Sequence, residues 1–143
     1  MDIEECFRRS FIRKTTVDSG LIRSLIKMSA VKEKAVRTAT TEEETISAYV
    51  SLAYDALREV LEAICVSIGY KVLSHVCIGE LLKREIESFD YASFDRMRYI
   101  RNGINYYGED VEFKQGKEII EKIFAMKQSL LEKHLKKFVE ERK

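Results

Sequence analysis

Arginine and amide side chains are concentrated between residues 98 and 108 of this chain. If this stretch is helical, four of its polar residues share one face, because spacings of three, four and seven residues return to the same side of an α-helix. These residues are Arg98, Arg101, Asn102 and Asn105. Two guanidinium groups beside two amides can bind a phosphate in a bidentate geometry that lysine does not offer. The alternative is a solvated face on which the arginines pair with Asp95 or Glu109.

The other residues of this stretch predict how it is held in place. Met97, Ile100 and Ile104 lie largely on another side of the helix and can be buried. Gly103 costs about 1 kcal/mol relative to alanine inside a helix, so it indicates a close backbone approach or a fraying helix end. Gly108 is then a natural stop for the helix.

The two histidines are the other candidates for chemistry near neutral pH. His75 follows Ser74 at an expected helix start, where the helix dipole favours the neutral imidazole, and it is either a proton-transfer group or a capping or packing residue. His134 lies among apolar residues and is expected at the edge of the core. Neither histidine follows a glutamate by three residues, and the His75–Cys77 pair has no partner pair. We therefore expect no metal site and no cofactor.

Tyr99, Tyr106 and Tyr107 accompany the arginines of this stretch. Their rings could stack on nucleobases, as in proteins that bind single-stranded nucleic acids. They could also fill a dimer interface, where tyrosine and arginine are over-represented, and we favour this interpretation. The two interpretations are compatible if the cleft of the dimer is also the ligand site.

The composition indicates a single globular domain. The chain has 143 residues, of which 45% are hydrophobic and 34% are charged, and it contains no proline and only six glycines. This composition favours long helices over a turn-rich β protein. The net charge of +1 gives no general attraction for nucleic acid, so any such site must be a local patch.

Three features of the sequence predict the compartment. Cys6, Cys65 and Cys77 lack paired spacing, which indicates free thiols in a reducing environment. The acidic N-terminus is not followed by the apolar segment of a signal peptide, and no run of about 18 apolar residues could span a membrane. We therefore expect a cytoplasmic protein without membrane association.

Capping residues and apolar periodicity predict the helices of the first half. A short amphipathic helix is expected over residues 3–14, followed by a second helix that begins at a cap on Asp18 or Ser19. Thr41 and Glu44 have the spacing of a capping box, in which the two side chains satisfy backbone amides at a helix start. The helix behind this box has the clearest apolar periodicity in the chain and is expected to be the core helix.

The second half is expected to continue the helical pattern. Gly69 ends the core helix, residues 70–73 form a short connection, and Ser74 caps the next helix. The arginine-rich helix follows, then a loop over residues 109–116, and a last amphipathic helix over about residues 117–140. The fold class is therefore all-α.

The expected architecture is an up-down bundle with a core of four helices. Residues 1–40 would form an N-terminal helical extension, and residues 41–143 would form the bundle, within one structural domain overall.

The arginine-rich segment resembles the signature helix of the HEPN family, the all-helical "higher eukaryotes and prokaryotes nucleotide-binding" domains. The hallmark of that family is Arg-Asn-x-x-x-His. Arg101 and Asn102 match its first half, whereas Tyr106 stands in the position of the histidine. Residues 51–57 on the core helix and residues 69–75 before the next helix are also similar to the family.

This resemblance covers roughly residues 40–140 and implies a HEPN-like bundle. HEPN ribonucleases are metal-independent: the arginine steadies the phosphate and the histidine transfers a proton at the ribose 2′-hydroxyl, with two motifs meeting across a homodimer. HEPN domains often work beside a minimal nucleotidyltransferase in toxin–antitoxin or defence modules. The resemblance therefore implies a homodimer and a nucleotidyltransferase partner.

The departure at Tyr106 changes the expected function, because a tyrosine is a poor general base near neutral pH. We expect a protein that binds a nucleotide or RNA without efficient cleavage, with Arg101 as the phosphate contact. The ligand-binding residues would be Arg98, Arg101, Asn102, Asn105 and His75.

Two alternatives of other classes are kept. One is a metal-independent endoribonuclease, with Arg101 and either Tyr106 or His75 as its catalytic residues. The other is a dimeric adaptor that binds no small ligand.

Overall fold

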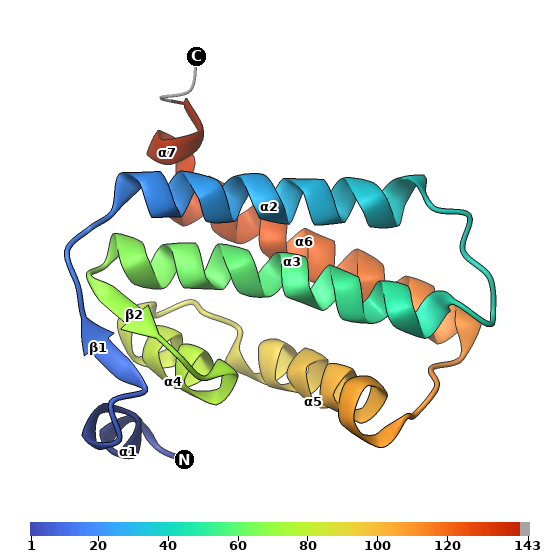
Figure 1. The fold of residues 1–143 in the computed structure, drawn as a ribbon, viewed down its shortest axis with the longest axis horizontal. Coiled ribbons are helices and arrows are strands. Elements are labelled where there is room, and N and C mark those ends of the chain that lie inside the picture. The colour runs from blue at the N-terminus through green and yellow to red at the C-terminus, as the bar shows by residue number, and fades with distance from the viewer. Residues whose placement is uncertain (141–143) are drawn as a thin grey trace.

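The computed structural model describes residues 1–140 and shows a mostly helical protein (Figure 1). In chain order the elements are α1 (Ile3–Arg8), β1 (Ile12–Lys14), α2 (Ser19–Thr38), α3 (Ile46–Ser67), β2 (Tyr70–Val72), α4 (His75–Glu85), α5 (Tyr91–Tyr107), α6 (Phe113–His134) and α7 (Lys136–Glu140). The expected all-α class is confirmed, with the addition of one small antiparallel ribbon. None of the helices in residues 1–140 is sufficiently long and apolar to cross a lipid bilayer.

Helix α3 is the centre of the fold, as its periodicity predicts. Most of its residues between Ile46 and Val66 are buried. Helices α2 and α6 pack along it, and α4 and α5 lie end to end along another side (Figure 1). Successive long segments run in opposite directions, so that α2 and α3 are antiparallel and α6 returns against α5. Residues 1–40 therefore contribute a principal helix, α2, to the same core.

Several helix ends fall where their capping residues place them. The side chain of Asp18 accepts a hydrogen bond from the backbone N of Leu21 at 3.0 Å, which caps α2. Gly69 follows α3 with a φ of +91°, and Gly108 ends α5 with a φ of +65°, both in the left-handed region that glycine adopts without strain.

The N-terminal segment differs from the expected helix over residues 3–14. Helix α1 stops at Arg8, and the chain then forms β1, which pairs antiparallel with β2 so that Ile12 lies opposite Val72. The expected short connection at residues 70–73 is thus largely a strand. This pairing joins residues far apart in the sequence, so local periodicity does not reveal it.

The expected capping box at Thr41 and Glu44 is wrong. Helix α3 begins at Ile46, and its N-cap is Thr45. The Thr45 hydroxyl accepts a hydrogen bond from the backbone N of Glu42 at 3.1 Å, which stabilises a turn before the helix. Residues 42–45 therefore satisfy their own polar groups in this turn and do not extend α3.

The last helix begins earlier and ends earlier than expected. Helix α6 starts at Phe113, so Gly116 lies inside it and not in a loop. A Cβ atom at Gly116 would lie 2.7 Å from Cγ1 of Ile46, which shows how closely α6 crosses α3 there. At the other end the helix breaks at buried Leu135, and α7 follows.

The expectation of three free thiols is wrong for two of the cysteines. Cys6 of α1 and Cys77 of α4 form a disulfide, whereas Cys65 is free and buried in α3. The two bonded residues are 71 positions apart and meet only because α1 docks on α4. The pairing removes the basis on which the sequence predicts a reducing compartment.

A buried ion pair joins α2 to α6. Lys127 is only 3% exposed, and its Nζ lies 2.6 Å from Oε1 of Glu33 and 3.4 Å from the carbonyl oxygen of Ser29. The Ser29 hydroxyl donates in turn to the carbonyl oxygen of Ala56 on α3 at 2.6 Å. These contacts tie three helices together at mid-length.

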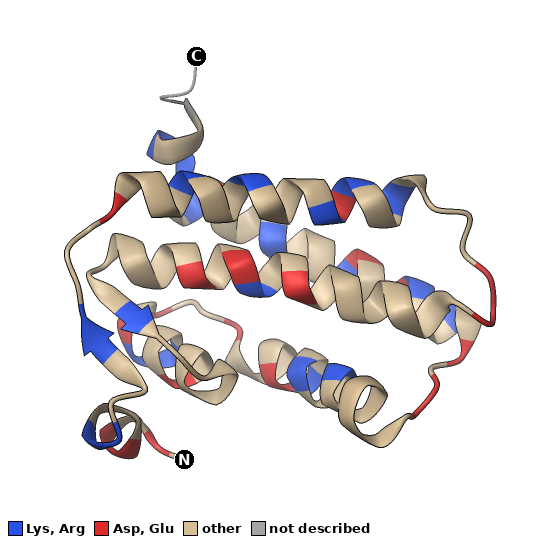
Figure 2. Ribbon diagram, in the orientation of Figure 1, with Lys and Arg blue, Asp and Glu red and all other residues tan. Residues whose placement is uncertain are grey.

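Charge also favours the pairing of α2 with α3. Among the charged residues that Figure 2 colours, most on α2 are Lys or Arg and most on α3 are Asp or Glu. Lys32 on α2 forms an ion pair with Glu59 on α3 at 3.1 Å, and both side chains are largely buried. This ion pair neutralises one charge of each helix inside the fold.

We expect Glu33→Gln to lower the free energy of unfolding by about 3 kcal/mol, because it leaves the Lys127 ammonium buried without its carboxylate. Lys127→Met should change it by less than about 1 kcal/mol, because the charge itself is replaced by an apolar chain of similar length. Urea denaturation at pH 7 measures both values. Equal losses in the two variants would contradict this assignment.

Reduction of the disulfide should lower the free energy of unfolding by about 4 kcal/mol, since the bond closes a long loop in the unfolded chain. Urea denaturation with and without a phosphine reductant measures the loss. The double variant Cys6→Ala/Cys77→Ala keeps Cys65 and should not respond to the reductant. Non-reducing peptide mapping that finds no Cys6–Cys77 linkage would rule out this bond.

Candidate functional site

The expected phosphate-contacting residues lie where α5 packs on α3. We call this place the Arg101 site, defined by Arg101, Asn102 and Tyr106 of α5, Tyr54 and Asp55 of α3, and His75 at the start of α4. Two of these elements are brought together by aromatic packing. Buried Phe94 of α5 stacks on Tyr54, with 6.1 Å between ring centroids and 18° between ring planes.

Arg101 is at the centre of the site. Its Nη2 lies 3.6 Å from Oδ1 of Asp55, and its Nη1 donates to the side-chain oxygen of Asn102 at 3.5 Å and to the Tyr106 hydroxyl at 3.4 Å. The guanidinium also lies over two rings, at 5.5 Å from the centroid of Tyr54 and 5.7 Å from that of Tyr106.

The contacts of Arg101 are long for a group so deeply placed. Its side chain is 13% exposed, yet its Nε is buried without a hydrogen-bond partner in the described residues. Oδ1 of Asp55 is likewise buried without a hydrogen bond, because 3.6 Å is an ion-pair distance and exceeds hydrogen-bond length. Unsatisfied polar atoms inside a protein are costly, so this guanidinium retains capacity for a better acceptor.

His75 and Tyr54 form the inner wall of the site. The Tyr54 hydroxyl lies 3.3 Å from Nδ1 of His75, and the two rings are 5.8 Å apart. Burial, together with the charges of Arg58 and Arg101, lowers the pKa of His75 to about 4. Burial raises the pKa of Tyr54, against the opposing effect of Arg101. Both side chains are therefore neutral at pH 7.

Arg98 and Asn105 already have partners within the chain. Arg98 donates through Nε and Nη2 to Oδ1 of Asp95, at 3.2 and 2.8 Å. The Ser51 hydroxyl of α3 donates to the side-chain oxygen of Asn105 at 2.9 Å. Of the proposed ligand-binding residues, Arg101 contacts Asn102 directly and His75 through Tyr54. Arg98 instead forms the salt bridge with Asp95 that the alternative of a solvated face predicts.

Gly103 lies inside α5 and Gly108 directly follows the helix, as the sequence predicts. Gly103 is buried, and a Cβ atom there would collide with Oε2 of Glu109. The chain after Gly108 folds back so that the backbone N of Glu109 donates to the carbonyl oxygen of Gly103 at 3.1 Å. The close approach expected at Gly103 is therefore made by the carboxylate of Glu109. This carboxylate lies against the helix and takes no part in the hydrogen bonds of Arg98 and Arg101.

The tyrosines beside the site lie on the surface. Tyr99, Tyr106 and Tyr107 are 74%, 68% and 78% exposed. Large aromatic rings left so open on one helix can contact a partner or stack on bases.

Sequence reasoning did not identify Tyr54 and Asp55 as site residues, nor Arg58 as a charge that acts on the site. The guanidinium of Arg58 hydrogen bonds to Glu62 one turn further along α3, and its charge contributes to the low pKa of His75. A signal for these residues exists: Asp55 and Arg58 are charged residues within the most apolar helix of the chain, where each requires a partner.

No group of three or more His, Cys, Asp or Glu side chains in residues 1–140 is arranged to hold a metal ion. Comparison of the chain with protein-family models, with curated proteins and with solved structures gives no match. The functional argument therefore depends on the geometry of the Arg101 site.

We expect the imidazole of His75 to titrate near pH 4 in the folded protein. Since the unfolded chain takes up this proton near pH 6.5, protein stability should fall as the pH drops from about 6.5 to about 4. NMR of the imidazole ring through a pH titration measures the midpoint. His75→Gln identifies the signal and should flatten the dependence of stability on pH in this window. A midpoint above 6 would contradict the buried placement of the ring.

Proposed function

We propose that this protein is a HEPN-like, up-down four-helix bundle that binds the phosphate of a nucleotide or RNA through Arg101 without efficient cleavage. In this view the bundle has four members: α2, α3 and α6 are three of them, and α4 together with α5 forms the fourth. Support comes from the opposite directions of successive segments and from the ion pair that Arg101 of α5 forms with Asp55 of the central helix.

The single observation that carries the proposal is the incomplete satisfaction of Arg101. Its Nε has no partner in the described residues, and its other contacts lie between 3.4 and 3.6 Å. A phosphate can accept two parallel hydrogen bonds from one guanidinium at about 2.8 Å. Binding such a group would therefore give Arg101 the short contacts that it lacks.

Acidic side chains limit how strongly the site attracts anions. Arg58, Arg98 and Arg101 each lie beside a carboxylate, at Glu62, Asp95 and Asp55 respectively. A phosphate must compete with Asp55 for Arg101, and binding must weaken as salt concentration rises. This balance favours a ligand that adds other contacts, such as base stacking on Tyr106.

Proton transfer has weaker support than binding. Tyr106 occupies the position of the family histidine, is exposed, and accepts a hydrogen bond from Arg101 through its phenolic oxygen. His75 reaches the site only through Tyr54, and its pKa of about 4 makes it a weak base at neutral pH. An endoribonuclease that uses Tyr106 or His75 is retained as the second candidate, because the His75–Tyr54–Arg101 contacts are continuous.

We further propose that two copies associate through α5 and that a nucleotidyltransferase is a partner. The three exposed tyrosines beside Arg101 support an interface on this helix, since monomers seldom expose several large aromatic side chains together. The partner is inferred only from the resemblance to HEPN proteins.

Arg101→Lys should weaken binding of a fluorescein-labelled single-stranded RNA by about tenfold, because lysine keeps the charge but loses the bidentate geometry. Asp55→Asn should tighten binding, because it removes the carboxylate that competes for Arg101. Fluorescence anisotropy in EDTA at several salt concentrations measures both effects. The matched control is Arg96→Lys, an exposed arginine on the same helix.

The same samples separate the three candidate functions. Cleavage of RNA in EDTA by the wild type, but not by Arg101→Ala, would establish the endoribonuclease. Equal RNA affinity for wild type and Arg101→Lys would refute the phosphate site. A dimer by light scattering together with no RNA binding would leave the adaptor, and a monomer at micromolar concentration would refute the dimer.

A further inference from the structure

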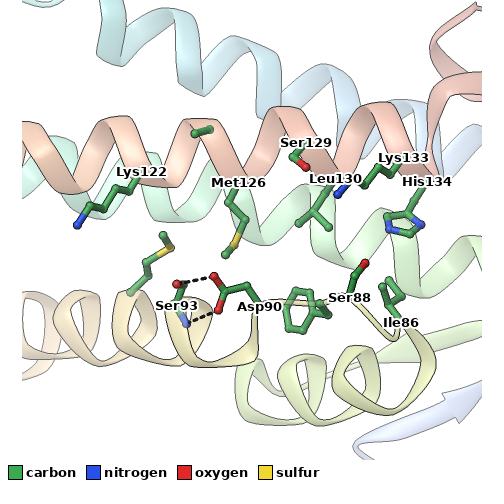
Figure 3. A pocket seen from close by; sticks show the side chains of 13 residues that line it. Ile86, Ser88, Asp90, Ser93, Lys122, Met126, Ser129, Leu130, Lys133 and His134 are labelled. Carbon is green, nitrogen blue, oxygen red and sulfur yellow. Dashed lines mark hydrogen bonds between the residues drawn. The ribbon is translucent and has the colours of Figure 1, made fainter.

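A groove separates α6 from the start of α5 and the segment that joins α4 to α5 (Figure 3). Its volume is about 450 Å³, within the range of about 300–1,000 Å³ that is usual for small-molecule sites. Helix α5 packs chiefly on α3 and α4, and the groove is the space left on its α6 side. None of its lining residues belongs to the Arg101 site.

Apolar side chains line the middle of the groove, together with Asp90 and Ser93, which Figure 3 shows below Met126. Phe89 and Met97 line it from one side, and Met126 and Leu130 of α6 line it from the other. Flexible methionine side chains can adapt to ligands of irregular shape. Neighbouring hollows share Met97 at one end, and Ile86 and His134 at the other, so the groove suits an elongated ligand.

Polar groups gather at the end formed by the last turns of α6. Figure 3 shows Ser129, Lys133 and His134 there, with Ser88 on the opposite side. Nε2 of His134 is buried and has no hydrogen-bond partner in the described residues. A buried polar atom without a partner is costly, and a polar atom of a ligand at this end would relieve that cost.

The charges of the groove favour an anion at this same end. Lys133 forms no ion pair within residues 1–140, and neither does Lys122 at the other end of the groove. Asp90 also lines the groove, but both of its carboxylate oxygens accept hydrogen bonds from Ser93, at 3.1 and 2.7 Å. The carboxylate is therefore engaged in capping α5 and keeps its negative charge, and the two lysines keep positive charges without an ion pair in residues 1–140.

The two lysines differ in what surrounds them. Lys133 lies at the end of the groove that also has Ser129 and His134, whereas Lys122 lies at the other end and also lines the neighbouring hollow, together with Met97. They are 11 residues apart on one helix, which corresponds to about 16 Å along its axis. This spacing separates the end at Lys133, with Ser129 and His134, from the end at Lys122.

We propose that this groove binds a small elongated amphiphile with one carboxylate, of the chemical class of a medium-chain fatty acid. The carboxylate lies at Lys133, where Ser129 and His134 supply further hydrogen bonds, and the hydrocarbon chain lies along Met126, Phe89 and Met97. Lys122 contributes only its apolar stem. This site is independent of the phosphate site at Arg101.

The test is calorimetric titration of the full chain with decanoate. We expect saturable binding with one site per chain, and Lys133→Met should weaken it by about fivefold to tenfold through loss of the charge contact. Lys122→Met is the matched control on the same helix and should change the affinity by less than about twofold. Decanol, which has the chain without the charge, should bind the wild type and Lys133→Met alike.

Variants that fill the groove with a large side chain test whether decanoate binds there. Ser129→Trp places a large ring in the groove from a half-exposed position of α6 and should abolish binding, and Ala125→Phe does the same from an exposed position one turn earlier. Circular dichroism identifies which of the two variants is folded. Absence of saturable decanoate binding to the wild type would overturn the proposal, as would wild-type affinity in a folded blocking variant. Equal losses in Lys133→Met and Lys122→Met would overturn the placement of the carboxylate.

Discussion

The burial of α3 on nearly all sides is the constraint on which the rest of the structure depends. A helix packed by α2, α6, α4 and α5 offers little surface to water, so each polar side chain on it needs a partner from a neighbouring helix. Glu59 forms an ion pair with Lys32 of α2, and Asp55 forms an ion pair with Arg101 of α5. The polar contacts of α3 therefore fix which helix lies on which side.

The Arg101 site is a consequence of this constraint. The pair of Asp55 and Arg101 is separated by 3.6 Å, and both residues retain buried atoms without hydrogen bonds, as do Arg58 and Glu59 on α3. The same low-dielectric surroundings keep His75 neutral, with the Tyr54 hydroxyl 3.3 Å from its Nδ1. The site therefore combines a guanidinium with an unused donor and a histidine that is uncharged at neutral pH.

The packing of α5 has a second consequence on its opposite side. Phe94 stacks on Tyr54, and Asp90 is committed to capping the helix, so the contacts of α5 are directed toward α3 and α4. Helix α6 is held instead by α3 and, through Lys127 and Glu33, by α2. Because α5 and α6 are each fixed by other neighbours, a groove remains between them, and it is lined by the methionines Met97 and Met126.

The sequence by itself determined the elements whose signals are local. Apolar periodicity placed α3, the Asp18 cap began α2, and Gly69 and Gly108 ended their helices, because each signal acts within a few residues. The tertiary structure alone decided the contacts between distant segments: the Cys6–Cys77 disulfide, the β1–β2 pairing, and the meeting of Asp55, His75 and Arg101. Local propensity carries no information about such pairs, since which faces come together depends on how all the helices pack at once.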